Sequence, residues 1–239
     1  MNKGMRLCAW AFASAALVLP LVSWSAGGGS MGGGMSSSPS MEPAAPPSPE
    51  QDARSAYNDG VRTVNKAKSA DSDAGKAKDE AKKQKLLDKA LKGYRSALEQ
   101  FTRAVENDDS LFQAWNYIGF CQRHLGDYQA ALNAYARALA LNPAYSEAVE
   151  YRGEAYLGLN RTEDAKAAYM LLFRDARPLA AELMTAMRRW VDQRHVDPQG
   201  VGADELAAFS SWVSERATVA QQTASLAGDG IAKPLADWK

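Results

Sequence analysis

Apolar residues recur at helical spacing through most of the chain after Gln51, with charged and polar residues between them. This spacing is typical of amphipathic helices, and no stretch alternates apolar and polar residues as a half-buried strand would. Ala, Leu, Glu, Lys, Arg and Gln, which favour or tolerate helices, are abundant there. Helix-stopping residues interrupt the pattern at 107–110, 142–143, 177–178 and 197–202. The sequence therefore predicts an all-α fold.

The pattern also repeats with a period of 34 residues. The same residue recurs one period later at several positions: Tyr117 and Tyr151, Gly119 and Gly153, Leu125 and Leu159, Ala131 and Ala165, Tyr135 and Tyr169. One period earlier, the similar residues are Ala97, Leu98, Phe101 and Ala104. A period of this length is typical of stacked helical hairpins, which bury their apolar faces against their neighbours.

The repeated glycines have a physical explanation in such hairpins. Glycine within a helix costs roughly 0.5–1 kcal/mol, so a packing requirement is the natural reason for it. We expect Gly119 and Gly153 to lie where the two helices of a hairpin cross, because a missing side chain permits close approach. The aromatic residues Tyr135 and Tyr169 would then fill the remaining space.

Two segments, 114–145 and 147–178, resemble the tetratricopeptide repeat family. The first has the family pattern in register: Trp115, Ile118, Gly119, Gly126, Tyr128, Ala131, Tyr135, Ala138 and Pro143. The second keeps Gly153, Tyr156, Ala165 and Tyr169, but Val149 replaces the tryptophan and Pro178 is displaced. The resemblance implies a short solenoid of helical hairpins that binds another protein and has no catalytic activity.

The repeats divide the chain into units. Residues 112–145 and 146–179 are two repeats, and residues 53–111 are a degenerate first repeat whose first helix would come from residues 56–67. The charged run at 68–88 is then either an insertion or a long helical extension. Two amphipathic segments within 180–227 are expected to be capping helices, because a short array must cover its last apolar face. Residues 228–239 form a tail.

The first 26 residues have the pattern of a secretory signal peptide, with Lys3 and Arg6 before an apolar run and small residues after it. A retained membrane anchor is the alternative, although Pro20 interrupts the run and a span needs about 20 apolar residues. Residues 27–52 are rich in Gly, Ser and Pro, which predicts a disordered tether. We expect a periplasmic or secreted protein of an exported bacterial type.

No arrangement of residues predicts an enzyme, a cofactor or a metal site. The formal net charge is zero, and His124 and His195 are the only histidines. The sequence contains no glycine-rich phosphate loop after a strand, no nucleophile elbow and no zinc-binding pair of histidines on a helix. Cys121 falls in an apolar helical stretch, so we expect it to be buried in the core.

Residues 62–95 carry eleven basic and five acidic side chains. Binding to nucleic acid is disfavoured because the stretch has almost no aromatic residues to stack on bases, and an exported protein meets little nucleic acid. Two interpretations remain open. The stretch is either a solvated helix of mixed charge or a contact for an anionic lipid or polysaccharide surface of the cell envelope.

The family resemblance also implies where a partner would bind. Family members usually hold peptides along the concave surface formed by the first helix of each hairpin. Carried over position by position, that surface contains Gln113, Asn116, Phe120, Arg123, Glu147, Glu150 and Glu154. We expect Phe120 to be an apolar anchor and the three glutamates to form an acidic stripe. The Lys and Asn set that binds a C-terminal carboxylate in chaperone-binding members is missing, so we expect a protein or peptide partner with a basic or mixed segment.

Overall fold

Helices follow one another through residues 46–228, the part of the chain that the computed structural model describes, with side chains described up to residue 223. They are α1 (Pro49–Lys76), α2 (Glu80–Asn107), α3 (Phe112–His124), α4 (Tyr128–Leu141), α5 (Ser146–Gly158), α6 (Thr162–Asp175), α7 (Arg177–Val196) and α8 (Ala203–Gly228). These residues contain no strand, so the all-α class is confirmed. The expected signal peptide, the tether up to residue 45 and the tail beyond Gly228 lie outside the described residues.

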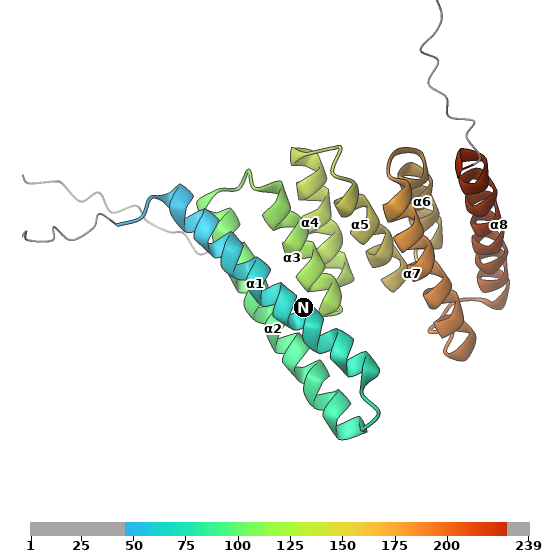
Figure 1. The fold of residues 1–239 in the computed structure, drawn as a ribbon, viewed down its shortest axis with the longest axis horizontal. Helices are drawn as coiled ribbons and strands as arrows, with labels where there is room; N and C mark the ends of the chain where they lie inside the picture. Colours follow the sequence, from blue (N-terminus) through green and yellow to red (C-terminus); the bar gives the residue numbers. More distant parts are fainter. Residues whose placement is uncertain (1–45, 229–239) are drawn as a thin grey trace, which may run out of the picture. The chain divides into compact units, whose positions relative to one another are not determined.

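Neighbouring helices pair as hairpins: α1 with α2, α3 with α4, and α5 with α6. Contacts of α2 with α3 and of α4 with α5 join one hairpin to the next, and Figure 1 shows them in a row. At the end of the row α7 packs on α5 and α6, and α8 packs on α7. A short solenoid with a helical cap is therefore confirmed.

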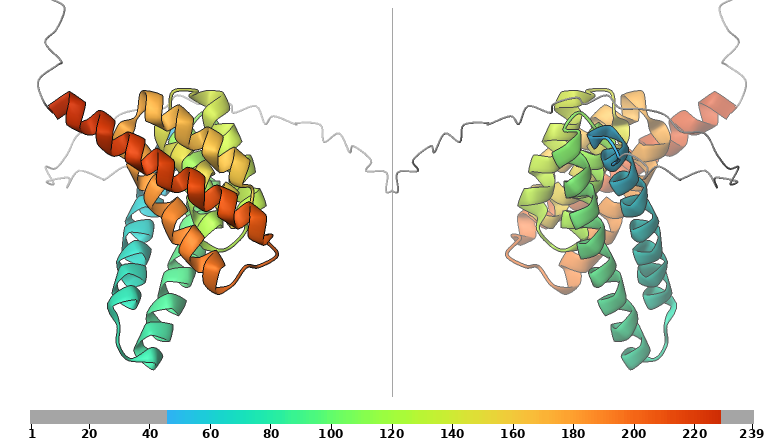
Figure 2. Two further views of the ribbon diagram at one scale, coloured as in Figure 1. Left: turned by 90° about the vertical axis from the view of Figure 1, so that its right-hand side faces the viewer. Right: turned by 90° about the vertical axis from the view of Figure 1, so that its left-hand side faces the viewer.

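The first hairpin is complete and has longer arms than the others. Its helices α1 and α2 each have 28 residues, whereas α3 to α6 have 13 or 14. At 1.5 Å per residue the long helices extend about 42 Å, and their closed end projects past the neighbouring hairpin (Figures 1 and 2). The charged run at 68–88 comprises the end of α1, the connection at 77–79 and the start of α2, so it lengthens both helices of the first hairpin.

The start of α1 lies inside the residues expected to form the tether. Ser48 Oγ accepts a hydrogen bond from the Gln51 backbone N–H at 3.3 Å, and Gln51 Oε1 accepts one from the Ser48 N–H at 2.9 Å. This reciprocal capping box satisfies two N–H groups that have no helical partner. Pro49 suits the first helical position because its missing N–H is not needed there. The helix therefore begins at Pro49 despite the proline-rich composition.

The repeated glycines lie at close contacts, as the pattern predicts, but their partners differ. A Cβ on Gly60 would lie 2.7 Å from the Phe101 ring, so the first hairpin has the close crossing that Gly119 gives the second. A Cβ on Gly153 would lie 2.6 Å from a methyl group of Leu183 on α7. The same Cβ would lie 3.3 Å from the Ala168 Cβ on α6, so Gly153 serves the crossing of its own hairpin, as expected, and also admits the capping helix.

The two capping helices bury the apolar stripes expected from the sequence. In α7 the buried residues of the stripe are Leu183, Met187, Trp190 and Val191, and in α8 they are Leu206, Phe209 and Val213. Leu179 and Trp212, which complete the two expected stripes, are only partly buried. The indole N–H of Trp190 donates to the Leu157 carbonyl at 2.7 Å, which fixes α7 to the end of α5. Within the described residues no helix is long and apolar enough to cross a membrane.

Candidate functional site

The first helix of each hairpin, together with α7, forms one layer that we call the inner layer. In it α3 contacts α5 and α5 contacts α7. The ring of Tyr57 on α1 lies edge-on to Tyr117 on α3, with 6.0 Å between centroids. The seven residues expected to bind a partner lie on α3 and α5, in the middle of this layer.

Phe120 is a core residue and not an exposed anchor. It is 4% exposed, and its ring packs edge-on against Tyr94 of α2 at 6.0 Å and Tyr151 of α5 at 5.2 Å. The ammonium group of Lys68 on α1 lies 5.5 Å from the centre of the same ring. Phe120 therefore joins the three hairpins, and the expectation that it projects into a groove is corrected.

Asn116, one turn earlier on α3, is also buried, at 2% exposed. Its amide donates to the Tyr145 hydroxyl at 3.5 Å, while its carbonyl oxygen has no hydrogen-bond partner. Gln113 and Arg123 are partly exposed. On α3 these two are therefore the expected site residues that a partner can reach without disturbing the core.

The three glutamates share a helix face, as their spacing predicts, but they do not form an exposed acidic stripe. Glu147 is exposed, Glu150 is only 1% exposed, and Glu154 forms an ion pair with Arg123. Burial and the adjacent charge of Glu154 raise the pKa of the Glu150 carboxyl well above its ordinary value. Because Glu150 is protonated near neutral pH and Glu154 is paired, Glu147 is the one free negative charge of the three.

The ion pair between Arg123 and Glu154 links α3 to α5 across the inner layer. The guanidinium of Arg123 also lies 5.4 Å from the ring centres of both Phe120 and Tyr151. Burial opposes its charge, but Glu154 more than offsets this effect, and the pKa of Arg123 is raised.

Beside Arg123, burial and then the charges of Arg123 and Lys68 lower the pKa of His124 to about 3. His124 is therefore neutral, and its 3.9 Å approach to Asp71 is not an ion pair at neutral pH.

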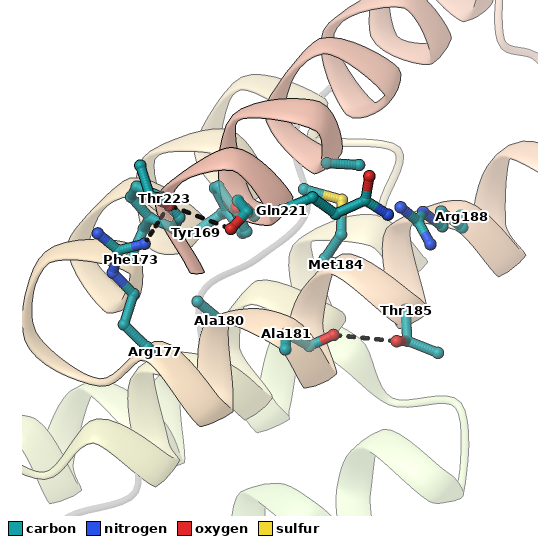
Figure 3. A pocket seen from close by; sticks show the side chains of 12 residues that line it. Tyr169, Phe173, Arg177, Ala180, Ala181, Met184, Thr185, Arg188, Gln221 and Thr223 are labelled. Atoms are coloured by element: carbon teal, nitrogen blue, oxygen red, sulfur yellow. Dashed lines mark hydrogen bonds between the residues drawn. The ribbon is translucent and has the colours of Figure 1, made fainter. Parts of the chain in front are cut away.

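A cleft of 710 Å³ lies between α6, α7 and α8 (Figure 3). Its walls are mainly apolar, and they include Tyr169, Phe173, Ala180, Met184, Ala217 and Ala220. At one end the Arg177 guanidinium lies 3.5 Å from the Phe173 ring centre and donates to Thr223 Oγ1 at 3.1 Å. The repeat register gave no signal for this cleft, because it forms where the non-repetitive α8 crosses the array.

Cys121 packs in the core, as its apolar surroundings predict. Burial raises the pKa of its thiol to about 12, so it is not a reactive thiolate at neutral pH. Among the described residues no group of three or more His, Cys, Asp or Glu side chains is arranged to hold a metal ion.

Two family models, both described as tetratricopeptide repeat, match the sequence over residues 76–144 and 123–187. These ranges begin at the last residue of α1 and reach the middle of α7, so they cover α2 to α6 and the first half of α7 but not the body of α1. Residues 76–187 carry tetratricopeptide repeats. Among curated proteins no relative matches the sequence.

Several solved tetratricopeptide structures resemble this chain at low identity. The domain of Arabidopsis OM64 has a TM-score of 0.41 and 15% identity, over 58% of this chain and 98% of that one. The first domain of Spaghetti (RPAP3), bound to the HSP90 peptide SRMEEVD, has a TM-score of 0.34 and 20% identity, over 63% and 95%. The second domain of human RPAP3, in complex with the HSP70 peptide SGPTIEEVD, has a TM-score of 0.30 and 15% identity, over 65% and 98%.

Proposed function

We propose that the chain is a non-enzymatic adaptor of the cell envelope that binds a segment of another protein along the inner layer of its tetratricopeptide repeats. The observation that carries the proposal is that both repeat models match hairpins whose first helices, α3 and α5, contact each other. Arrays of this kind create extended concave surfaces for binding. The signal-peptide pattern of residues 1–26 supports the envelope location.

The accessible part of this surface differs from the set that family resemblance gives. Asn116, Phe120 and Glu150 are buried and support the surface from beneath. Gln113 and Glu147 stand one repeat apart at the starts of α3 and α5, and both have exposed atoms. We therefore assign direct contact to these two residues and to the exposed edge of the Arg123 and Glu154 pair.

The test uses two double variants of the full chain with matched chemistry. Gln113→Arg with Glu147→Arg places bulky cations on the inner layer, and Asn133→Arg with Glu163→Arg places them at exposed positions of α4 and α6. Each variant is used to capture partners from an envelope fraction, and the captured proteins are identified by cross-linking and mass spectrometry. We expect a partner that is lost with the inner variant and kept with the outer one. Equal capture by both variants would refute the inner-layer surface.

A second function is favoured by one feature of α2. Lys82, Lys85, Lys89 and Lys92 follow one another at spacings that place them on one helix face, and all four are exposed. None of the four forms an ion pair within residues 46–228. We propose that this face, on the projecting hairpin, contacts an anionic envelope surface, at about 1 kcal/mol per lysine near such a membrane.

Vesicle sedimentation tests this second function. We expect the full chain to sediment with vesicles of phosphatidylglycerol and phosphatidylcholine and not with phosphatidylcholine alone, with binding that weakens as salt is added. Lys85→Glu with Lys89→Glu should abolish sedimentation, whereas Lys66→Glu on α1 should leave most of it. Sedimentation that is unaffected by the α2 substitutions would exclude this face.

A further inference from the structure

A cavity of 340 Å³ lies where the ends of α3 and α5 meet α7, at one edge of the inner layer. Three arginines from two helices line it, together with a glutamate, a glutamine and a tryptophan: Arg123, Arg189, Arg194, Glu154, Gln193 and Trp190. We call it the arginine cavity. Neither the repeat pattern nor the family models mark it, because four of these residues belong to the second half of the capping helix α7.

Arg194 is held in place before any ligand arrives. Its side chain is 7% exposed, its guanidinium lies 5.2 Å from the Trp190 ring centre, and its Nε–H donates to Asn160 Oδ1 at 3.2 Å. Asn160 is itself fixed, because its amide donates to the Gln199 carbonyl at 3.1 Å and its backbone has a φ of 57°, which asparagine tolerates. A charged group pinned in this way loses little freedom on binding an anion.

The other charges of the cavity leave an excess of positive charge. Glu154 is paired with Arg123, and that pair is neutral as a unit. The Nε–H of Arg123 is buried and has no hydrogen-bond partner. His124, which also lines the cavity, is neutral because burial and the neighbouring cations lower its pKa. Arg189 is exposed and Arg194 is buried, and no second acidic side chain lines the cavity to balance them.

We propose that the arginine cavity binds one carboxylate side chain, an aspartate or a glutamate, of the partner segment that lies along the inner layer. The proposal rests on the proposed function and adds the chemistry of one partner residue. Guanidinium groups match the planar carboxylate with paired N–H donors, and Gln193 supplies a further amide donor at the rim.

This assignment departs from the basic or mixed segment expected from the sequence. That expectation rested on the missing Lys and Asn set, and the acidic stripe that would favour a basic segment does not form, because Glu150 is buried and Glu154 is paired. A partner running from Glu147 toward the cavity would instead meet one free acidic residue at one end and two free arginines at the other. Such an arrangement also fixes the direction in which the segment binds.

The test uses side-chain Nε–Hε NMR signals of the full chain, titrated with acetyl-aspartyl amide and, separately, with its neutral analogue acetyl-asparaginyl amide. We expect the Arg194 and Arg189 signals to shift saturably with the acid and not with the amide. Arg189→Gln should weaken acid binding about fivefold, as loss of a partly exposed ion pair does. Arg188→Gln is the matched control, because Arg188 is also exposed on α7 but does not line this cavity.

Each outcome of the titration either supports or contradicts a carboxylate site in the arginine cavity. Shifts limited to the acid, with a loss specific to Arg189→Gln, support the assignment. No shift, equal shifts with the amide, or equal losses in the Arg188 and Arg189 variants would overturn it. Arg194→Lys provides a second check, since it keeps the charge but should lower affinity if paired donors are needed. The partner-capture experiment does not depend on this cavity, so failure here leaves the adaptor function standing.

Discussion

Gly119 on α3 lies directly against the ring of Tyr135 on α4, so closely that a Cβ built on the glycine would be 2.5 Å from Tyr135 Cε1. Tyr135 is fully buried and cannot move aside without disturbing its neighbours. The tight crossing of this hairpin therefore depends on a residue without a side chain. The same pair of positions, Gly60 and Phe101, serves the first hairpin.

Replacing Gly119 with alanine should destabilise the domain by about 1–3 kcal/mol, because the added methyl group overpacks a buried aromatic contact. Gly75 is the matched control: it is also helical, but a Cβ there would meet nothing within 4 Å. Gly75→Ala should stabilise the domain by roughly 0.5–1 kcal/mol, because alanine is the better helix former. Urea denaturation followed by circular dichroism measures both. Similar effects in the two variants would show that the Gly119 contact is relaxed in solution.

The hairpins could be predicted from sequence because a 34-residue period records packing that recurs along the chain. Glycine, alanine and tyrosine at fixed offsets report local helix crossings. The start of α1 was harder to predict from the sequence, because Ser48 and Pro49 suit both a linker and a capped helix. The capping box between Ser48 and Gln51 favours the helix, but it exists only once the helix has formed.

The site was less predictable than the fold. Spacing placed the three glutamates on one face, but it gave no sign that Glu150 is buried or that Arg123 from the preceding hairpin pairs with Glu154. Likewise, the aromatic residues around Phe120 come from three hairpins that are far apart in sequence. Whether a side chain contacts a partner directly or only supports the binding surface from beneath depends on such long-range neighbours, which a repeat pattern does not specify.

Phe120→Ala should cost about 3–5 kcal/mol of stability, the usual range for removing a buried aromatic side chain. The reason is the loss of its contacts with Tyr94 and Tyr151, which hold neighbouring hairpins together. Val196→Ala is the control, since Val196 is 87% exposed at the end of α7 and its truncation should change stability by less than about 0.5 kcal/mol. Thermal unfolding of both variants measures this. If Phe120→Ala is as stable as Val196→Ala, the ring does not join the hairpins.

Glu150 should make the domain less stable as the pH rises. Burial and Glu154 raise its pKa in the folded state above the ordinary 4.5, so the folded form keeps a proton that the unfolded form loses first. Its contribution is complete below the unfolded pKa and declines as the pH rises through the folded pKa, with a slope of up to about 1.4 kcal/mol per pH unit.

Glu150→Gln should remove that slope and stabilise the domain at pH 8, because the amide is neutral at every pH and has nearly the same shape. Glu147→Gln, one turn earlier and exposed, should leave the slope unchanged. Denaturant unfolding between pH 4 and pH 9 compares the two variants with the wild type. A wild-type slope that survives in Glu150→Gln would assign the pH dependence to another group.

Cys121 should react with a thiol reagent only when the domain opens. The thiol is buried and its pKa is raised to about 12 by that burial, so both access and ionisation oppose reaction in the folded state. The sequence has one other cysteine, Cys8, so the measurement uses a Cys8→Ser background. There, labelling should be slow at pH 7.5 and its rate should follow the equilibrium population of the open form. Adding Gly119→Ala, two residues away on α3, should speed labelling about tenfold for each 1.4 kcal/mol of stability lost, whereas adding Gly75→Ala should slow it. Fast labelling in the unaltered fold would mean that α3 opens locally, without unfolding of the neighbouring hairpins.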